Sequence, residues 1–129
     1  MGLFNKLFGN SEEQKNEKNL SWIDLTEIDQ LQTIKKLSFN KTQIIFKHSI
    51  RCSISRMVKN QFVEDYALNE QDADLYYLDL INNRTVSNAV EDLFKVVHES
   101  PQVLVIKNGV VVAHDSHGAI NDLDLKSFL

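Results

Sequence analysis

The sequence predicts an α/β fold, in which strands and helices alternate along the chain. Three observations support this prediction. Apolar residues recur with helical period in long segments, and short apolar runs of strand length separate those segments. Ile44, Ile45 and Phe46 follow one another directly, which is typical of a strand buried on both faces of a sheet. Asn108 and Gly109 stand between two apolar runs and predict a tight hairpin.

The first predicted strand spans residues 20–25. Thr26 is expected to cap a helix over residues 27–38, because apolar side chains recur there at helical spacing. These side chains are Leu31, Ile34 and Leu37. Residues 43–47 contain the unbroken apolar run and form the buried strand.

The second predicted helix spans residues 53–68. We expect its inward stripe to be Ile54, Met57, Val58, Phe62 and Tyr66. Residues 75–80 are rich in aromatic side chains and predict a strand. Residues 84–98 form the third predicted helix. Its inward side chains are expected to be Val86, Ala89, Val90, Leu93, Phe94 and Val97.

The chain closes with a strand over residues 102–107, the hairpin turn, a returning strand over 110–114 and a helix over 120–129. The inward residues of this helix are expected to be Leu123, Leu125 and Phe128. The resulting order is β-α-β-α-β-α-β-β-α. It predicts three α/β/α layers, in which helices cover both faces of a parallel sheet and the hairpin adds an antiparallel edge.

Residues 20–129 are expected to form one domain, which a tail and a linker precede. Residues 1–9 place apolar side chains on one face of a helix too short to be stable alone, so a loose tail is favoured. The alternative is a helix that docks on a partner or on a membrane surface. Residues 10–19 are polar throughout and predict a flexible, solvated linker.

The composition excludes several classes of function. A net charge of −4 gives no electrostatic basis for binding nucleic acid. No apolar run approaches the length of a membrane span, and the first residues lack the pattern of a secretory signal. One cysteine forms no internal disulfide, and with scattered histidines it supplies no metal site. We expect a cytoplasmic protein without a bound metal, and we expect it to be a monomer.

The one cysteine, Cys52, lies between the buried strand and the second predicted helix. A thiol at a helix start meets the positive end of the helix dipole and unpaired N–H groups, which favour the reactive thiolate. The nearest cations in the sequence are Lys47, His48, Arg51 and Arg56. They are expected to lower the pKa of the thiol, and Ser53 and Ser55 can donate hydrogen bonds to a thiolate or cap the helix. The alternative is a buried cysteine acting as a small apolar residue, which its polar neighbours disfavour.

Pro101, the one proline, precedes the strand over residues 102–107. From the residues alone it is a helix stop. A cysteine that opens the second long helix, together with a proline before an Asn-Gly hairpin, resembles thioredoxin, and the likeness is strongest over residues 101–129. In thioredoxins this proline is cis and lies against the active cysteine. The resemblance therefore implies a cis bond between Ser100 and Pro101, with backbone that pairs with an incoming disulfide-bearing partner.

The motif around the cysteine narrows the resemblance. Thioredoxins have two cysteines separated by two residues, whereas this chain has Cys52-Ser53-Ile54-Ser55. Together with the preceding Phe46-Lys47-His48-Ser49, this motif is similar to bacilliredoxins of the YtxJ type, the monothiol proteins of the bacillithiol system. Arg51 and Ser53 replace the Thr and Pro of that family's motif, which bears on substrate preference. The similarity covers residues 20–129.

The resemblance implies a thioredoxin-like fold and a reaction in which Cys52 removes bacillithiol, or a similar low-molecular-weight thiol, from protein mixed disulfides. Ser55 would donate a hydrogen bond to the thiolate, and Pro101 would complete the catalytic site. The expected binding residues are His48, Arg51, Ser53, Arg56 and Ser100. No cofactor is expected to be bound, because the small thiol is a co-substrate. Since Ser55 cannot attack a disulfide, the expected partners are thiolated client proteins, the small thiol and its reductase.

Three alternatives stay open on the sequence. The first is a glutaredoxin-like monothiol protein that uses glutathione or bridges an iron–sulfur cluster, although the Cys-Gly-Phe-Ser motif is absent. The second is an arsenate-reducing or peroxide-reducing thiol enzyme on a related fold, although no oxyanion-binding arginine pattern is evident. The third is a non-enzymatic redox sensor or binding module with a thioredoxin-like fold.

Overall fold

The computed structural model describes residues 20–129, so the predictions for the tail and the linker lie outside the described residues. The strands are β1 (Trp22–Asp24), β2 (Thr42–His48), β3 (Ala73–Asp79), β4 (Gln102–Lys107) and β5 (Val110–Ser116). The α-helices are α1 (Asp29–Leu37), α2 (Ser53–Asp65) and α3 (Arg84–Phe94). Two 3-10 helices, η1 (His117–Asp122) and η2 (Leu125–Phe128), follow the last strand.

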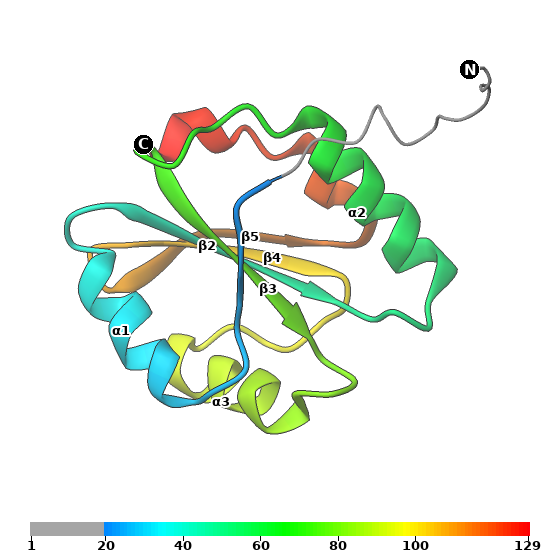
Figure 1. Ribbon diagram of the computed structural model, residues 1–129, viewed down its shortest axis with the longest axis horizontal. Helices are drawn as coiled ribbons and strands as arrows, with labels where there is room; N and C mark the ends of the chain where they lie inside the picture. The colour runs from blue at the N-terminus through cyan, green and yellow to red at the C-terminus, as the bar shows by residue number, and fades with distance from the viewer. Residues whose placement is uncertain (1–19) are drawn as a thin grey trace, which may run out of the picture.

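The strands form one mixed sheet in the order β1-β3-β2-β4-β5 (Figure 1). Strands β1, β3 and β2 are parallel to one another. Strand β4 runs antiparallel to β2, and β5 runs antiparallel to β4. The predicted architecture, a parallel sheet with an antiparallel edge supplied by the hairpin, is therefore confirmed.

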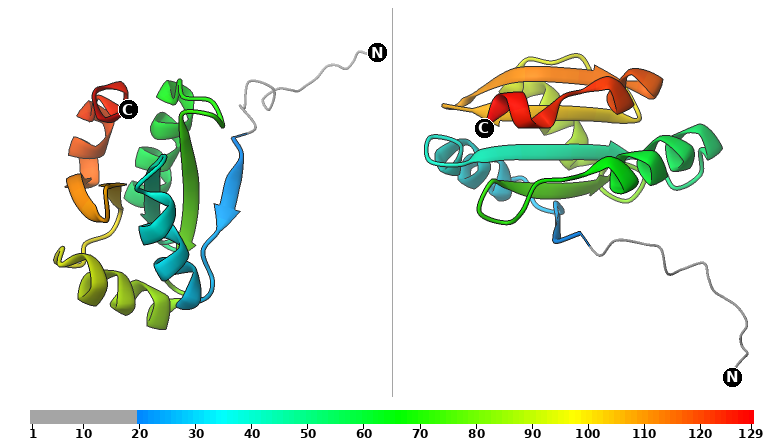
Figure 2. Two further views of the ribbon diagram at one scale, coloured as in Figure 1. Left: turned by 90° about the vertical axis from the view of Figure 1, so that its left-hand side faces the viewer. Right: turned by 90° about the horizontal axis from the view of Figure 1, so that it is seen from above.

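Helices cover both faces of the sheet (Figures 1 and 2). Helices α1 and α3 bury Leu31, Ile34, Val86 and Val90 against one face, together with Ile45, Leu78 and Leu104 from the strands. Helix α2 and η1 bury Val58, Phe62 and Ile120 against the other face, together with Ile44, Phe46 and Val105. The side chains of neighbouring strand residues point to opposite faces, so one strand supplies both cores.

Strand β2 lies at the centre of the sheet, and all seven of its residues are buried. The predicted strand that is buried on both faces is thereby confirmed. Its last two residues, Lys47 and His48, are polar but are only 0% and 3% exposed. Lys47 pairs with Gln102 of β4, and His48 pairs with Asp79 of β3. The carboxyl end of β2 therefore meets the start of β4, immediately after Pro101.

The hairpin between β4 and β5 is fixed by residues that follow α1. Asn108 and Gly109 have φ values of +53° and +83°, as the predicted turn requires. The N–H of Asn108 donates to the Ser38 carbonyl at 2.9 Å, and the N–H of Gly109 donates to Ser38 Oγ at 2.8 Å. The ring of Phe39 lies over Gly109, where a Cβ atom would stand 2.8 Å from Phe39 Cζ. The turn therefore needs a glycine both for its backbone and for its contact.

Two predicted helix boundaries are wrong for local reasons. Helix α1 begins at Asp29 with Ile28 at the cap, because the Gln30 side chain, in place of a Thr26 hydroxyl, accepts the N–H groups of Thr26 and Glu27 at 2.8 and 2.9 Å. Helix α3 ends at Phe94, since Lys95 adopts a left-handed conformation with φ +62°. Val97, predicted to face inward, therefore lies beyond the helix and is 73% exposed.

Helix α2 and the last segment of the chain also differ from expectation. Helix α2 ends at Asp65, and two members of its predicted inward stripe, Ile54 and Met57, are 59% and 71% exposed. Ser55 is buried in their place, because the face that carries Val58 and Phe62 also carries position 55. The predicted final α-helix is replaced by η1 and η2. Strand β1 is shorter than predicted, and β5 extends to Ser116.

Candidate functional site

Cys52 is the N-cap residue of α2, as the sequence predicted. Its backbone is extended, with φ −106° and ψ 120°, and its carbonyl accepts the N–H of Arg56 at 3.1 Å. Its own N–H donates to the Ser49 carbonyl at 3.2 Å, which closes the loop after β2. The residue is half-buried. A partly exposed sulfur at the start of a thirteen-residue helix can both meet a substrate and use the helix dipole.

Ser55, in the first turn of the helix that Cys52 caps, has a fully buried side chain. Its Oγ lies 2.7 Å from His48 Nδ1 and accepts the N–H of Ser49 at 3.2 Å. These are the two hydrogen-bond partners of the hydroxyl among residues 20–129, and the expected hydrogen bond from Ser55 to the Cys52 sulfur stays a prediction. The contact between His48 and Ser55 joins the end of β2 to the first turn of α2, the two elements between which Cys52 lies in the sequence.

His48, one of the expected binding residues, is the last residue of β2. The ring is buried between α2 and the sheet, with the Phe46 and Tyr77 rings at centroid distances of 6.4 and 5.8 Å. Burial is the main cause that lowers the pKa of His48, and the cations Lys59 and Arg56 lower it further. Asp79 acts in the opposite direction. The imidazole is therefore a neutral group at physiological pH.

The bond between Ser100 and Pro101 is cis, as the resemblance implied. Pro101 is buried, and its carbonyl accepts the N–H of His117 at 3.0 Å. Gln102 at the start of β4 pairs with Lys47 near the end of β2. The loop that contains Pro101 therefore lies at the same end of the strands as the loop that carries Cys52. Among the buried side-chain nitrogen and oxygen atoms of residues 20–129, Ser100 Oγ is the one without a hydrogen-bond partner. An unpaired hydroxyl at this position is available to a bound group.

Two of the four cations near the cysteine in the sequence lie on the surface. The side chains of Arg51 and Arg56 are exposed, and Arg56 Nη1 also donates to the Ile50 carbonyl at 3.1 Å. Ser53, another predicted binding residue, is exposed as well. Lys47 was expected beside the thiol but is buried on the other face of the sheet, because neighbouring residues of a strand point to opposite faces.

Lys47 belongs to a buried polar cluster that the sequence did not predict. Its Nζ lies 3.2 Å from His98 Nδ1, and Ser87 Oγ lies 3.2 Å from the same atom. Burial lowers the pKa of Lys47 to about 8; Glu91 opposes the shift and Arg84 adds to it. The cluster ties β2 to α3 and to the segment that leads into Pro101. The sequence offered one signal for this cluster, a lysine that directly follows the apolar run of β2. The same position is also typical of a lysine on the surface.

Apolar side chains close to the cysteine in the sequence are exposed. Ile50, Ile54 and Met57 are 46%, 59% and 71% exposed, and all three lie within five residues of Cys52. Exposed apolar side chains of this size favour contact with another protein. The site therefore combines a half-buried thiol, two exposed guanidinium groups and an apolar rim.

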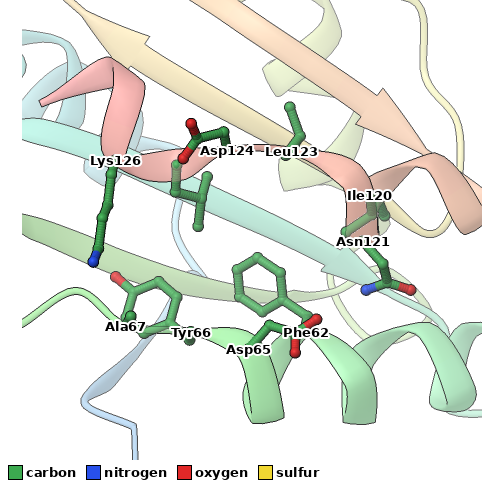
Figure 3. A pocket seen from close by; sticks show the side chains of 10 residues that line it. Phe62, Asp65, Tyr66, Ala67, Ile120, Asn121, Leu123, Asp124 and Lys126 are labelled. Atoms are coloured by element: carbon green, nitrogen blue, oxygen red, sulfur yellow. The ribbon is translucent and has the colours of Figure 1, made fainter.

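A separate pocket lies at the other end of α2 (Figure 3). It has a volume of about 150 Å³, and its lining includes Phe62 of α2, Tyr66 directly after the helix, and Ile120, Leu123 and Lys126 from the last segment. Cys52 does not line it. Within residues 20–129 there is no group of three or more histidine, cysteine, aspartate or glutamate side chains arranged to hold a metal. In the same part of the chain, no helix has the length and apolar character needed to cross a membrane.

Residues 23–125 match a family model described as monothiol bacilliredoxin BrxC. A solved structure described as a candidate oxidoreductase with a thioredoxin fold is 37% identical to this chain, with a TM-score of 0.67. The match covers 82% of this chain and 91% of that chain.

More distant likenesses are to thioredoxins. Thioredoxin from Malassezia sympodialis, a member of a pan-allergen family, is 14% identical with a TM-score of 0.64, over 85% of this chain and 90% of that chain. Thioredoxin from Schistosoma mansoni is 18% identical with a TM-score of 0.62, over 84% of this chain and 95% of that chain. At these identities the likeness shows a shared thioredoxin-like fold.

Proposed function

The chain belongs to the monothiol bacilliredoxin family, whose members have a thiol–disulfide redox role, and from that premise we propose what its cysteine does. The Cys52 thiolate attacks the small-thiol sulfur of a mixed disulfide between a client protein and bacillithiol, or a similar low-molecular-weight thiol. The disulfide bond of the client breaks, and the client cysteine leaves as a thiolate that takes a proton from water. Cys52 then carries the small thiol as a new mixed disulfide.

The observation that supports this proposal most directly is the position of Cys52 at the N-cap of α2 in a chain without a second cysteine. Ser55 occupies the place of a resolving cysteine, and a hydroxyl does not attack a disulfide. The second step therefore needs an external thiol. A second molecule of the small thiol, or a partner reductase, attacks the mixed disulfide on Cys52 and returns the thiolate.

Two further features support a small anionic thiol as the transferred group. The exposed guanidinium groups of Arg51 and Arg56 can pair with carboxylates, and the malate part of bacillithiol carries such groups. Ser100 Oγ, buried and without a partner, can bond to the substrate beside the cis proline. The apolar rim of Ile50, Ile54 and Met57 then faces the client protein.

The proposal is tested with a client protein that has one cysteine, modified in one sample with bacillithiol and in another with glutathione. We expect intact mass spectrometry to show release of the client thiol and a gain of one bacillithiol on the wild-type protein. Cys52→Ser, the matched control, should do neither. Multiple turnover with excess bacillithiol and a reductase should follow, which a sensor modified once would not show. Absence of the adduct and of client release would contradict the proposal, and faster reaction with the glutathione adduct would assign the glutathione-using alternative.

A further inference from the structure

The Ser55 hydroxyl has one proton, and the surrounding atoms restrict where that proton can point. Ser55 Oγ accepts the N–H of Ser49 at 3.2 Å, so one of its two acceptor positions is occupied. His48 Nδ1 lies 2.7 Å from the same oxygen, and the donor in this second contact depends on the histidine tautomer. The tautomer of His48 therefore determines the direction of the hydroxyl proton.

The two tautomers have different consequences for the cysteine. If His48 carries its proton on Nε2, then Nδ1 is an acceptor, and the Ser55 hydroxyl proton is used in the bond to His48. If His48 carries its proton on Nδ1, then Nδ1 donates to Ser55 Oγ, and both acceptor positions of the oxygen are filled. The hydroxyl proton is then free for a third group.

The candidate for this third group is the sulfur of Cys52, the N-cap residue of the same helix. Ser55 is the third residue of the helix that Cys52 caps, and the side chain of an N-cap residue normally turns toward the backbone N–H groups of the second and third helical residues. Cys52 makes no side-chain capping bond in the structure, so its sulfur is free to accept one when it becomes a thiolate. We propose that His48 holds its proton on Nδ1 and donates it to Ser55, so that the Ser55 hydroxyl donates to the Cys52 thiolate.

The hydrogen bonds of the His48 ring favour this arrangement. Within residues 20–129 the ring bonds through Nδ1, so a proton on Nε2 gains no protein acceptor, whereas the proposed arrangement adds a bond to the thiolate. The charged groups that act on the ring are Lys59 and Arg56 from α2 and Asp79 from β3. His48 does not touch the substrate in this arrangement, so it is a positioning residue.

The first test is the pH dependence of Cys52 alkylation by iodoacetamide, measured on the protein alone. Ser55→Ala and His48→Phe should each raise the midpoint of the rate by roughly one pH unit, because a hydrogen bond to the charged sulfur is lost. The double variant should shift it no further than Ser55→Ala, because both changes remove the same bond. His48→Asn, whose amide can donate from the place of Nδ1, should restore a midpoint close to wild type.

Two results of this test would overturn the proposal. The first is that the alkylation rate of His48→Phe has the same midpoint as that of the wild type, although the midpoint of Ser55→Ala is raised. The other is an additive shift in the double variant, which would mean that His48 acts independently of Ser55. The proposal depends on the proposed function only in assigning Cys52 a reactive thiolate, and iodoacetamide needs no bacillithiol. Failure here is therefore distinguishable from failure of the mixed-disulfide reaction.

The second test determines the His48 tautomer in the wild-type protein. Nitrogen-15 NMR of the histidine side chains in the wild-type protein distinguishes an Nδ1 proton from an Nε2 proton, and the signal that disappears in His48→Asn identifies His48. We expect the Nδ1 tautomer at a pH where Cys52 is alkylated at its full rate. The Nε2 tautomer under those conditions would overturn the proposal.

Discussion

Because the amine of Lys47 is buried, the free energy of unfolding should rise when the solution becomes mildly alkaline. Burial lowers the pKa of Lys47 from 10.5 in the unfolded chain to about 8 in the folded one. Between these two values the unfolded chain binds more protons at this site than the folded chain, so the free energy of unfolding increases with pH. Well below pH 8 the amine is protonated in both states, and its contribution no longer changes with pH.

The size of the effect follows from the same two values. Raising the pH from 7 to 9 crosses the folded-state pKa by one unit, which corresponds to about 1.4 kcal/mol of added stability. In urea this should move the unfolding midpoint upward by about 0.5 to 1.5 M. The measurement should stop at pH 9, because Tyr66 and Tyr76 have pKa values raised from 10.0 to about 12 and reduce stability above pH 10.

The assay is urea unfolding followed by circular dichroism at pH 7, 8 and 9. All variants carry Cys52→Ser, so that thiol titration does not contribute to the slope. Lys47→Met should remove the rise, because a thioether does not titrate, whereas Lys36→Met on the exposed end of α1 should keep it. A flat or falling free energy in the Lys47 protein would refute the reasoning, and so would the same rise in Lys47→Met.

Two further substitutions test the turn and the surface charges. Gly109→Ala should destabilise the fold by about 1 to 3 kcal/mol, because φ is +83° and the new Cβ would meet Phe39 at 2.8 Å. A Cβ at Gly118 would meet no atom of residues 20–129 within 4 Å, so Gly118→Ala should change the urea midpoint little; equal losses in the two variants would contradict this prediction. Replacing Arg51 or Arg56 by Gln should each raise KM for the bacillithiol adduct by up to about fivefold at low salt, and the effect should fade at high salt. Arg84→Gln on α3 is the matched control, and an equal rise there would remove the case for a local carboxylate contact.

Local signals predicted much of the fold. The Asn108-Gly109 turn fixed the bounds of β4 and the start of β5, because its backbone conformation suits few other residues. The apolar run of β2 and the start of α2 at Cys52 were also predicted. The end of α3 was not, since the left-handed conformation of Lys95 leaves no mark in the apolar pattern.

The polar part of the site was harder to predict, because side-chain pairing across elements depends on tertiary packing. Ile54 and Met57 are apolar and lie in the same helix as the buried Val58, so the apolar pattern alone did not show that both are exposed. Lys47 and His48 are buried because β2 is central, although both have the composition of surface residues. The position of Cys52 in the sequence was enough to predict a reactive thiol. The contact between His48 and Ser55 is seen only in the folded chain.

Both ends of the described chain lie at the opposite end of the sheet from the thiol. Trp22 of β1 pairs near the start of β3, and Phe128 accepts a hydrogen bond from Thr42 at the start of β2, whereas Cys52 follows the end of β2. Seven residues of extended strand separate the two ends by about 20 Å. A fluorescent reporter, an affinity tag or a surface linker attached before Leu20 or after Leu129 would therefore leave the thiol accessible. The domain is suited to immobilised or fused redox probes that report on protein thiolation.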